Sequence, residues 1–282
     1  MEMPWSLPWS PTIGVCSWSL RPRTPAELVE RVGSTGLSAV QLALTPLVEV
    51  AGAWGATAAI LRDAGISIVS GMLETVGEDY SSIERIAATG GVRPDATWPR
   101  TRERAARVAD VAATLGLSLV TFHAGFLPHD PRDPERARML DRLRDVASIF
   151  ALRGVHIAFE TGQEPAATLV ECLEALAAPT VGVNFDPANM LLYGSGDPVD
   201  ALRRLTPYVR QVHVKDAIPS GRSGEWGAEV PVGAGRVDWA AFFAALTPCR
   251  HRPNLIIERE AGDKRVEDVR TARDFLARRS IG

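Results

Sequence analysis

Short apolar runs alternate with longer amphipathic stretches along most of the chain. The apolar runs predict eight strands, at residues 13–18, 39–44, 66–72, 119–123, 156–160, 181–186, 209–214 and 255–258. The stretches between them repeat apolar residues at every third or fourth position, which is typical of helices. They predict the main helices at residues 25–32, 56–64, 100–115, 134–152, 164–177, 198–205, 239–246 and 266–279. Strands that alternate with helices in this way indicate parallel βαβ units, so we expect an α/β fold, a (β/α)8 TIM barrel.

The length of the chain agrees with a single barrel domain. A barrel of this kind takes roughly 250 residues, and the chain has 282 residues with no visible linker. Residues 1–11 contain three prolines and two tryptophans, and we expect them to form an irregular arm. The alternative fold is a doubly wound open sheet. It is less favoured because the first strand is followed by no G-x-G-x-x-G motif and the chain has no P-loop motif.

Two long segments, 77–99 and 215–237, interrupt the alternation of strands and helices. The first contains one short predicted helix at residues 82–88, and the second is rich in glycine and serine. Excursions of this length inside a compact domain are usually lids or binding loops. The second segment includes Gly-Arg-Ser-Gly at residues 221–224. This run could grip a phosphate, since barrel phosphate sites use the late loops, but we favour its interpretation as a surface loop.

Composition narrows the classes of function. Hydrophobic residues make up 46% of the chain and charged residues 23%, as in an ordinary soluble globular protein. The formal net charge of −3 argues against a polyanion binder, so nucleic acid is not an expected partner. The three cysteines are widely spaced, which fits a reducing, cytoplasmic location better than a disulfide framework. No apolar run approaches the roughly 20 residues that span a bilayer, and no membrane association is expected.

Four side chains with oxygen or nitrogen donors stand where predicted strands end. They are Glu160, Asp186, His213 and Glu258. The carboxyl ends of parallel strands lie at one end of a barrel, so these side chains would converge. Three buried carboxylates would repel one another unless a cation lay between them. The set predicts one divalent metal ion, with Mn²⁺ or Mg²⁺ favoured and Co²⁺ or Zn²⁺ as alternatives, and open positions for substrate oxygens.

A simpler interpretation applies to any one of these residues taken alone. A single acid at a strand end is commonly a helix N-cap or an ion-pair partner, and this is our interpretation of Asp216. A single histidine is more often a core residue than a ligand. For the four residues together, position and donor type agree four times, which favours a site over coincidence.

Five motifs accompany these residues: F-E-T-G at 159–162, N-F-D-P-A-N at 184–189, H-V-K-D at 213–216, V-G-A-G-R-V-D-W at 232–239 and I-I-E-R-E at 256–260. In these motifs, and along nearly its whole length, the chain resembles the xylose isomerase-like TIM-barrel superfamily. This superfamily includes tagatose/psicose 3-epimerases, hydroxypyruvate isomerase and inosose dehydratase. The resemblance implies that Glu160, Asp186, His213 and Glu258 hold one divalent metal ion. It also implies that Glu160 and Glu258 move the proton.

The chain departs from the ketose 3-epimerases at two positions. Asn189 stands where those enzymes usually have a histidine, and Lys215 stands where they usually have an arginine, so the H-V-K-D run is closer to the inosose dehydratase branch. An asparagine can hold a substrate hydroxyl but cannot act as an acid or base near neutral pH. We expect Lys215, His123 and Asn189 to bind substrate oxygens and Trp18 to wall the pocket. For Trp18, ordinary core packing is an equal alternative.

The predicted function is a divalent-metal-dependent isomerase or epimerase of a sugar or sugar phosphate. It would abstract a proton next to a carbonyl group through a metal-stabilised enediolate. The alternative is an inosose dehydratase-like enzyme or a keto-glycoside lyase. Less favoured are an apurinic-site endonuclease, which needs more histidines, and a non-catalytic sugar-binding barrel. The expected partner is a small carbohydrate, and the resemblance implies a homodimer or homotetramer.

Overall fold

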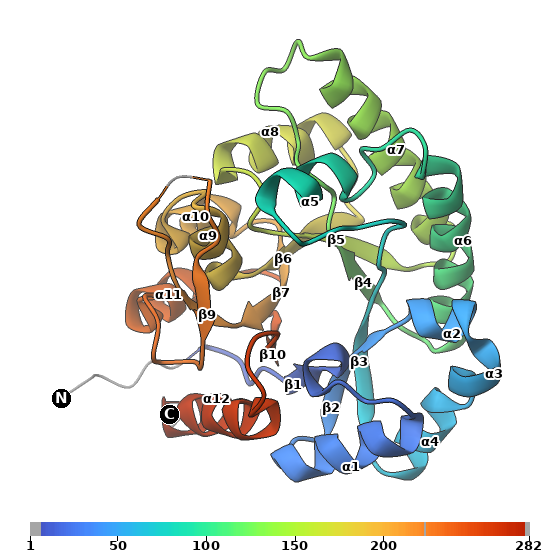
Figure 1. Cartoon of the computed structure of the whole chain (residues 1–282), viewed down its shortest axis with the longest axis vertical. Coiled ribbons are helices and arrows are strands. Elements are labelled where there is room, and N and C mark those ends of the chain that lie inside the picture. The colour runs from blue at the N-terminus through green and yellow to red at the C-terminus, as the bar shows by residue number, and fades with distance from the viewer. Residues whose placement is uncertain (1–6, 223, 280–282) are drawn as a thin grey trace.

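The eight apolar runs form the eight parallel strands of a closed barrel (Figure 1). The computed structural model describes residues 7–222 and 224–279 of the chain. The strands are β1 (Ile13–Cys16), β2 (Ala39–Ala43), β3 (Ser67–Met72), β4 (Leu119–Phe122), β5 (His156–Glu160), β6 (Val181–Phe185), β7 (Val209–Val214) and β10 (Asn254–Ile257). Their order around the barrel is β1-β10-β7-β6-β5-β4-β3-β2, and the ring is closed because β1 pairs with both β10 and β2. The predicted (β/α)8 barrel is confirmed.

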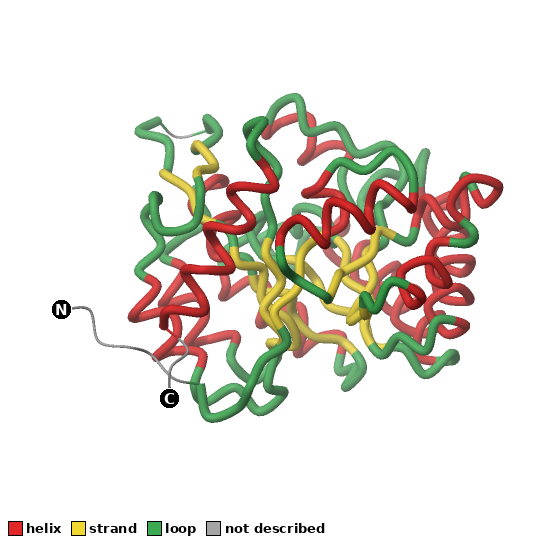
Figure 2. Tube along the Cα trace, turned by 90° about the horizontal axis from the view of Figure 1, so that it is seen from below, coloured by secondary structure: helices red, strands yellow, loops and turns green. Residues whose placement is uncertain are grey.

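Helices connect the strands and cover the outside of the barrel, while the strands occupy its centre (Figure 2). The helices are α1 (Pro25–Thr35), α2 (Thr45–Glu49), α3 (Ala51–Trp54), α4 (Thr57–Asp63), α5 (Ile83–Thr89), α6 (Trp98–Thr114), α7 (Pro134–Ala151), α8 (Ala166–Leu176), α9 (Pro187–Tyr193), α10 (Pro198–Leu205), α11 (Trp239–Leu246) and α12 (Arg265–Arg279). Several begin at a side-chain cap. Thr24, Asp133, Asp197 and Asp238 each accept a hydrogen bond from a backbone N–H of the first turn of the helix that follows. Asp238 thus marks the start of the helix predicted at residues 239–246.

The structure differs from the predicted elements in three places. The first strand ends at Cys16, and residues 17–20 form a 3₁₀ helix, η1 (Ser17–Leu20), so Trp18 leaves the barrel wall. Residues 45–54, for which no element was predicted, form the two short helices α2 and α3. Residues 187–193 form α9, because Pro187 fits the first turn of a helix and the preceding residue, Asp186, caps it.

Each of the two long segments contains short elements of regular structure. The predicted helix at residues 82–88 corresponds to α5. The segment 215–237 holds a two-stranded antiparallel hairpin of β8 (Asp216–Ile218) and β9 (Ala228–Val230), which projects from the barrel (Figure 2). No helix in the part of the chain that the structure describes is long and apolar enough to cross a membrane.

The barrel wall separates an apolar layer from a polar interior. Phenylalanines on the outer side of β4, β5 and β6 are fully buried under the helices, and Phe185 packs against Phe242 of α11 with 5.7 Å between ring centroids. The inward-facing positions carry neutral polar side chains that are also fully buried, namely Gln41, Ser70, Thr121, Asn184 and Gln211. Buried polar groups need hydrogen-bond partners. This interior layer is therefore a network that can hold neighbouring side chains in fixed orientations.

Candidate active site

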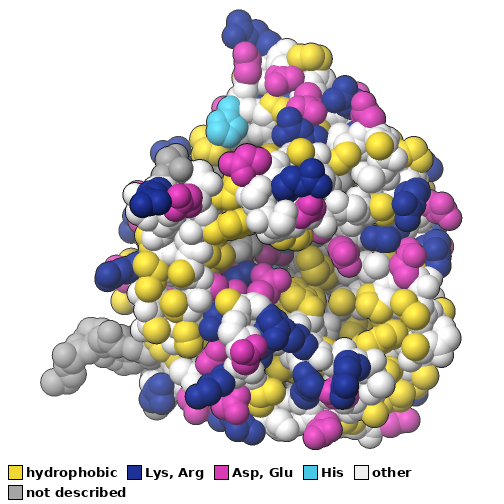
Figure 3. All heavy atoms as spheres, in the orientation of Figure 1, with side chains coloured by type: hydrophobic (Ala, Val, Ile, Leu, Met, Phe, Trp, Pro, Cys, Tyr) yellow, Lys and Arg dark blue, Asp and Glu magenta, His cyan; other side chains and the backbone are white. Residues whose placement is uncertain are grey.

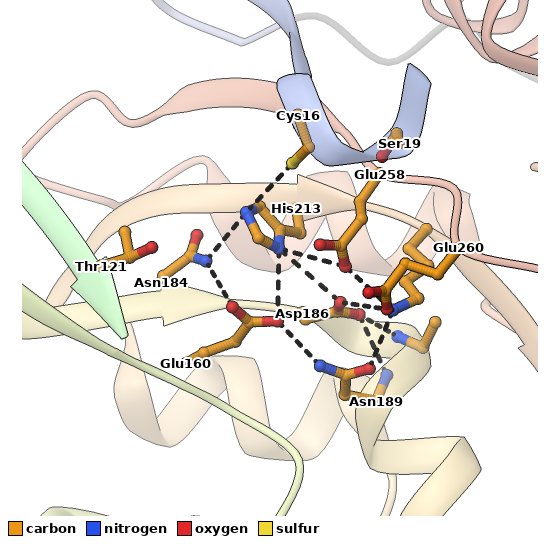
Figure 4. A network of polar contacts seen from close by, with 12 residues as sticks. Cys16, Ser19, Thr121, Glu160, Asn184, Asp186, Asn189, His213, Glu258 and Glu260 are labelled. Carbon is orange, nitrogen blue, oxygen red and sulfur yellow. Dashed lines mark hydrogen bonds and ion pairs between the residues drawn. The ribbon is translucent and has the colours of Figure 1, made fainter. Parts of the chain in front are cut away.

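The four predicted donors converge at the carboxyl end of the barrel. Glu160 is the last residue of β5, Asp186 follows β6, His213 lies in β7 and Glu258 follows β10. Each contributes one donor atom to a group in which all the atoms lie within 4.8 Å of one another. All four residues are buried. The structure thus brings together every residue of the predicted metal set (Figure 4).

The two nitrogens of the His213 ring face different surroundings (Figure 4). Nδ1 lies 3.4 Å from a carboxylate oxygen of Glu160, 3.4 Å from one of Glu258 and 3.8 Å from one of Asp186, yet none of these contacts is a hydrogen bond. Nε2 lies 2.7 Å from Oε1 of Gln41. With the proton on Nε2, the ring donates to this oxygen, and the lone pair of Nδ1 is directed at the three carboxylates. The other amide contact of Nε2 is Nδ2 of Asn184 at 3.0 Å.

A relay of buried amides keeps Gln41 in the orientation that this tautomer requires. Nε2 of Gln41 donates to Oγ1 of Thr121 at 2.7 Å, and Oε1 accepts from Nε2 of Gln211 at 3.0 Å. The hydroxyl of Ser70 donates a hydrogen bond to Oε1 of Gln211 at 2.6 Å. Oε1 of Gln41 is thus the atom that faces His213. Partners of this kind around a ligating histidine fix its tautomer and ring orientation.

The two carboxylate oxygens of Asp186 have different roles. One caps helix α9, and the other faces the centre of the site. Oδ1 accepts hydrogen bonds from the backbone N–H groups of Ala188 and Asn189 at the start of α9. Oδ2 is buried and has no hydrogen-bond partner. Two unpartnered buried atoms, Oδ2 of Asp186 and Nδ1 of His213, therefore face one point between three carboxylates. This arrangement fits a divalent cation, because a cation would satisfy both atoms and offset the repulsion.

Burial opposes the charged form of all three carboxyl groups, but their neighbours differ. For Glu258, Lys215 and His213 outweigh burial and hold its pKa well below the ordinary value. For Glu160, His123 and His213 likewise lower the pKa against the effect of burial. For Asp186, burial dominates, and repulsion from Glu258 and Glu160 helps to raise its pKa well above the ordinary value. The amino acids alone thus do not keep all three carboxylates charged.

Lys215 is a buried ammonium group in the wall of the site. It is 2% exposed, and Nζ donates to Oε2 of Glu258 at 2.9 Å and to Oε2 of Glu260 at 2.6 Å. Although burial works in the other direction, these two carboxylates raise the pKa of Lys215 well above its ordinary value. A third contact, 3.3 Å long, reaches Oδ1 of Asn189.

A cavity of about 700 Å³ opens over this cluster. It corresponds to the hollow in the middle of the face shown in Figure 3. The residues predicted to contact substrate, Trp18, His123, Asn189 and Lys215, all line it. Trp18 also donates from Nε1 to Oε1 of Glu258 at 2.8 Å, so it both walls the cavity and positions a carboxylate.

The interpretation of Asp216 as an N-cap or ion-pair partner is wrong. Its carboxylate accepts hydrogen bonds from the backbone N–H groups of Gly233, Gly235 and Val237 and from Nε1 of Trp239. A Cβ atom on Gly235 would lie 2.0 Å from Oδ1 of Asp216, so the second glycine of V-G-A-G allows this close approach. Asp216 therefore anchors the segment between β9 and α11.

Two residues that contribute to the site, Gln41 and Glu260, were not predicted from the sequence. The alternation of side chains along an extended segment indicates both. Gln41 is a single polar residue in the apolar run Ala-Val-Gln-Leu-Ala, where alternation turns it inward. Glu260 lies two positions after Glu258, and in an extended segment it falls on the same side. The described residues also form a second donor group of Cys16, His213 and Glu258. Cys16 approaches His213 at Nε2, 3.6 Å away, on the side that Gln41 occupies.

Comparison with known proteins agrees with this geometry. A family model described as "Xylose isomerase-like TIM barrel" matches residues 29–279. The chain belongs to the xylose isomerase-like TIM-barrel family. One solved member, a xylose isomerase domain protein from Planctomyces limnophilus, is 32% identical over 88% of this chain and 89% of that chain, with a TM-score of 0.81. No curated protein matches the chain.

Other solved structures share the fold at lower identity. A protein from Mycobacterium smegmatis in complex with magnesium is 14% identical over 96% of this chain and 97% of that chain, with a TM-score of 0.73. The 3-keto-D-glucoside 4-epimerase from E. coli is 16% identical over 95% of this chain and 100% of that chain, with a TM-score of 0.70. The solved structures similar to this chain thus include enzymes, among them epimerases and a probable dehydratase.

Proposed function

We propose that the protein is a divalent-metal-dependent sugar isomerase or epimerase that moves a proton at a carbon next to a carbonyl group. The observation that carries this proposal is the convergence of Glu160, Asp186, His213 and Glu258 within 4.8 Å, with two buried donor atoms left without partners. Similar structures described as sugar epimerases support the reaction class.

The four donors would hold the metal ion. Three carboxylates and one imidazole form a hard, oxygen-rich set, so Mn²⁺ or Mg²⁺ is the preferred ion, with Co²⁺ and Zn²⁺ as alternatives. When bound, the ion supplies Lewis-acid polarisation of a carbonyl oxygen, which makes the neighbouring C–H more acidic.

The proton is moved by the two glutamates. Glu258 accepts hydrogen bonds from Trp18 and Lys215, which keep it ionised and fix its position, so it is suited to remove the proton. Glu160 lies on β5, with β6 and β7 between it and β10, and it accepts a hydrogen bond from Nδ2 of Asn189 at 2.9 Å. Carboxylates that flank the substrate from two sides allow removal on one face and return on the other, which gives epimerisation.

The remaining polar groups would orient the substrate. Lys215 and Asn189 face the cavity beside Glu258 and Glu160, and His123 lies 3.8 Å from Glu160. Each offers a donor for a sugar hydroxyl. Trp18 closes one wall and limits the approach of water to Glu258.

A keto-sugar dehydratase or lyase is the second candidate, favoured by the pair of Lys215 and Glu260. Their 2.6 Å contact lines the cavity next to Glu258, where an acidic proton could pass to a leaving β-hydroxyl or alkoxide. Return of the proton to carbon gives an isomer or epimer, whereas loss of the β-substituent gives an enone.

Proton NMR in D₂O tests the proposal. The Mn²⁺-loaded protein is incubated with free ketoses, ketose phosphates, keto-inositols and keto-glycosides, and the ion is removed by chelation before spectra are recorded. Metal-dependent deuterium incorporation next to the carbonyl is expected, and the product distinguishes isomer, epimer and enone. Protein that holds its metal ion and exchanges no proton in any of these compounds would contradict the proposal.

A further inference from the structure

We infer that the substrate is an uncharged sugar carrying a second ring, as in a keto-glycoside, and not a sugar phosphate. This inference rests on the proposed function of the same site. It follows from three observations: carboxylates of the protein occupy backbone donors in the late loops, the cavity is acidic, and an aromatic wall lies one turn of α9 beyond Asn189.

Carboxylates of the protein itself occupy five backbone N–H groups in the late loops, the region where barrels commonly bind phosphate. After β7, Asp216 accepts the N–H groups of Gly233, Gly235 and Val237. After β10, Glu229 of β9 accepts the N–H groups of Glu260 at 2.9 Å and Ala261 at 3.1 Å. Two internal carboxylates thus take the hydrogen bonds that a phosphate would need.

The side chains around these loops are also paired. Arg259 contacts Glu229 at 2.7 Å and Asp268 at 2.8 Å, so its charge is already balanced. Arg222, in the loop considered as a phosphate grip, has a side chain 81% exposed, contacts Glu225 and does not line the cavity. Neither arginine offers an unpaired guanidinium to a substrate.

The charge of the cavity lining is negative. Five glutamates line it, at positions 74, 78, 229, 258 and 260, while the lining cation among the described residues is Lys215. Lys215 is shared between Glu258 and Glu260. A divalent ion would offset part of the charge of the metal ligands, and burial raises the pKa of Glu78 and so favours its neutral form, but Glu74 and Glu260 would still face a bound substrate. A phosphate dianion would meet repulsion here, whereas an uncharged sugar finds acceptors for its hydroxyls.

The size of the cavity and its aromatic wall indicate a second ring. A volume of about 700 Å³ lies within the range of roughly 300–1,000 Å³ that holds drug-sized ligands. Tyr193 follows Asn189 by one turn of α9, a rise of about 6 Å away from the metal set. Its ring stands 4.7 Å from that of Trp226 and 5.7 Å from that of Phe126. Trp226 and Tyr193 both line the cavity and offer apolar faces on which a second ring can pack.

Calorimetric titration of the Mn²⁺-loaded full chain tests the inference without turnover. The probes are methyl β-D-glucoside, phenyl β-D-glucoside and glucose 6-phosphate, none of which carries a C–H next to a carbonyl in the ring form. We expect the phenyl glycoside to bind at least about tenfold more tightly than the methyl glycoside, and no binding of the phosphate. Trp226→Ala should reduce the tenfold preference to less than about threefold, whereas Trp54→Ala, a tryptophan on α3 outside the cavity, should leave it unchanged.

Each other outcome overturns the inference. Equal binding of the two glycosides would show that the cavity has no site for a second ring. Tighter binding of glucose 6-phosphate would contradict the exclusion of phosphates by charge. No binding of any probe would contradict the assignment of a glycoside as substrate. Deuterium exchange separates this result from the proposed function. Preference for the phenyl glycoside without exchange on any keto substrate would refute the chemistry alone, while fastest exchange on a ketose phosphate would refute the substrate class alone.

Discussion

The two halves of the barrel contribute different chemistry to the same site. β5, β6, β7 and β10 end in the ionisable residues Glu160, Asp186, His213 and Glu258. The inward positions of β2, β3 and β4 instead carry the neutral side chains of Gln41, Ser70 and Thr121, all of them fully buried. Within the cluster, the late half supplies the four ionisable donors and the early half supplies uncharged hydrogen-bond partners. His123 and Glu74, which follow β4 and β3, line the cavity outside the cluster.

This division explains why the cluster calls for a cation. The amides and hydroxyls of the early strands can orient His213 and Gln211, but a neutral hydrogen-bond donor cannot balance three buried carboxylates. Lys215 contributes one positive charge and divides it between Glu258 and Glu260. Three kinds of substitution test the difference between the halves. They change a charged donor of the cluster, a neutral hydrogen-bond partner of the early strands, or a buried acid outside the cluster.

The largest effect is expected from removing the charge of Glu258. Glu258→Gln should reduce deuterium exchange next to the substrate carbonyl by at least about a hundredfold, because the general base is lost. Glu260→Gln is the matched control, since Glu260 also contacts Lys215 but is not among the four donors, and its effect should stay below about tenfold. Exchange by the Glu258 variant at the rate of the unmodified protein would remove it as the base.

Metal binding should stabilise the fold. An ion at a hundred times its dissociation constant adds about 2.7 kcal/mol to the free energy of unfolding, so Mn²⁺ should raise the melting temperature of the chelator-treated protein by several degrees. Asp186→Asn should abolish most of this shift, whereas Glu260→Gln should retain it. An equal shift in the unmodified protein and in the Asp186 variant would show that the ion binds elsewhere.

A smaller effect is expected from the neutral half. Gln41→Leu removes the acceptor for Nε2 of His213, so metal affinity should fall about tenfold to a hundredfold by calorimetric titration. Thr121→Val removes only the far end of the relay and should cost less affinity. If the Gln41→Leu variant binds the ion as tightly as the unmodified protein, the neutral residues of β2, β3 and β4 do not orient His213.

The smallest effect concerns Glu164, a buried acid of the late half outside the cluster. It is 4% exposed and forms no ion pair with a described residue, and burial raises its pKa from 4.5 to about 8. Between these values the folded chain retains a proton that the unfolded chain has released, so stability falls as pH rises through this interval. Glu164→Gln should therefore gain stability relative to the unmodified protein from pH 5 to pH 6, on the order of 1 kcal/mol.

Urea unfolding at the two pH values measures this gain. Glu174→Gln, an exposed position on α8, provides the control and should show the same difference at both. A Glu164 variant whose stability difference is also independent of pH would mean that the folded protein keeps Glu164 ionised.

Much of this architecture is predictable from the sequence because strand and helix periods differ. All eight strands lie where the apolar runs are, and the four donors follow from the rule that parallel strands share a carboxyl end. The short helices α2 and α3 were not predicted, since pieces of four or five residues carry too little periodicity. Helix α9 was not predicted because it begins directly after the strand-end aspartate of N-F-D-P-A-N, with no loop between them.

The parts that could not be predicted depend on side chains far apart in sequence. Gln41 and His213 are 172 positions apart, and only barrel closure shows that an amide and an imidazole meet. Asp216 presents the converse case. A strand-end acid suggests a cap, but the folded loop brings three backbone N–H groups from residues 233–237 to its carboxylate.

The pairing of β1 with β10 has a consequence for the order in which this protein matures. Trp18 is synthesised 240 residues before its partner Glu258, so their 2.8 Å hydrogen bond can form only after β10 has been synthesised. A nascent chain that has reached β7 has three of the four donors and an open sheet edge where β10 will insert. Capture of the metal ion by the full donor set therefore follows synthesis of the last strand, and partial translation products would lack the complete centre.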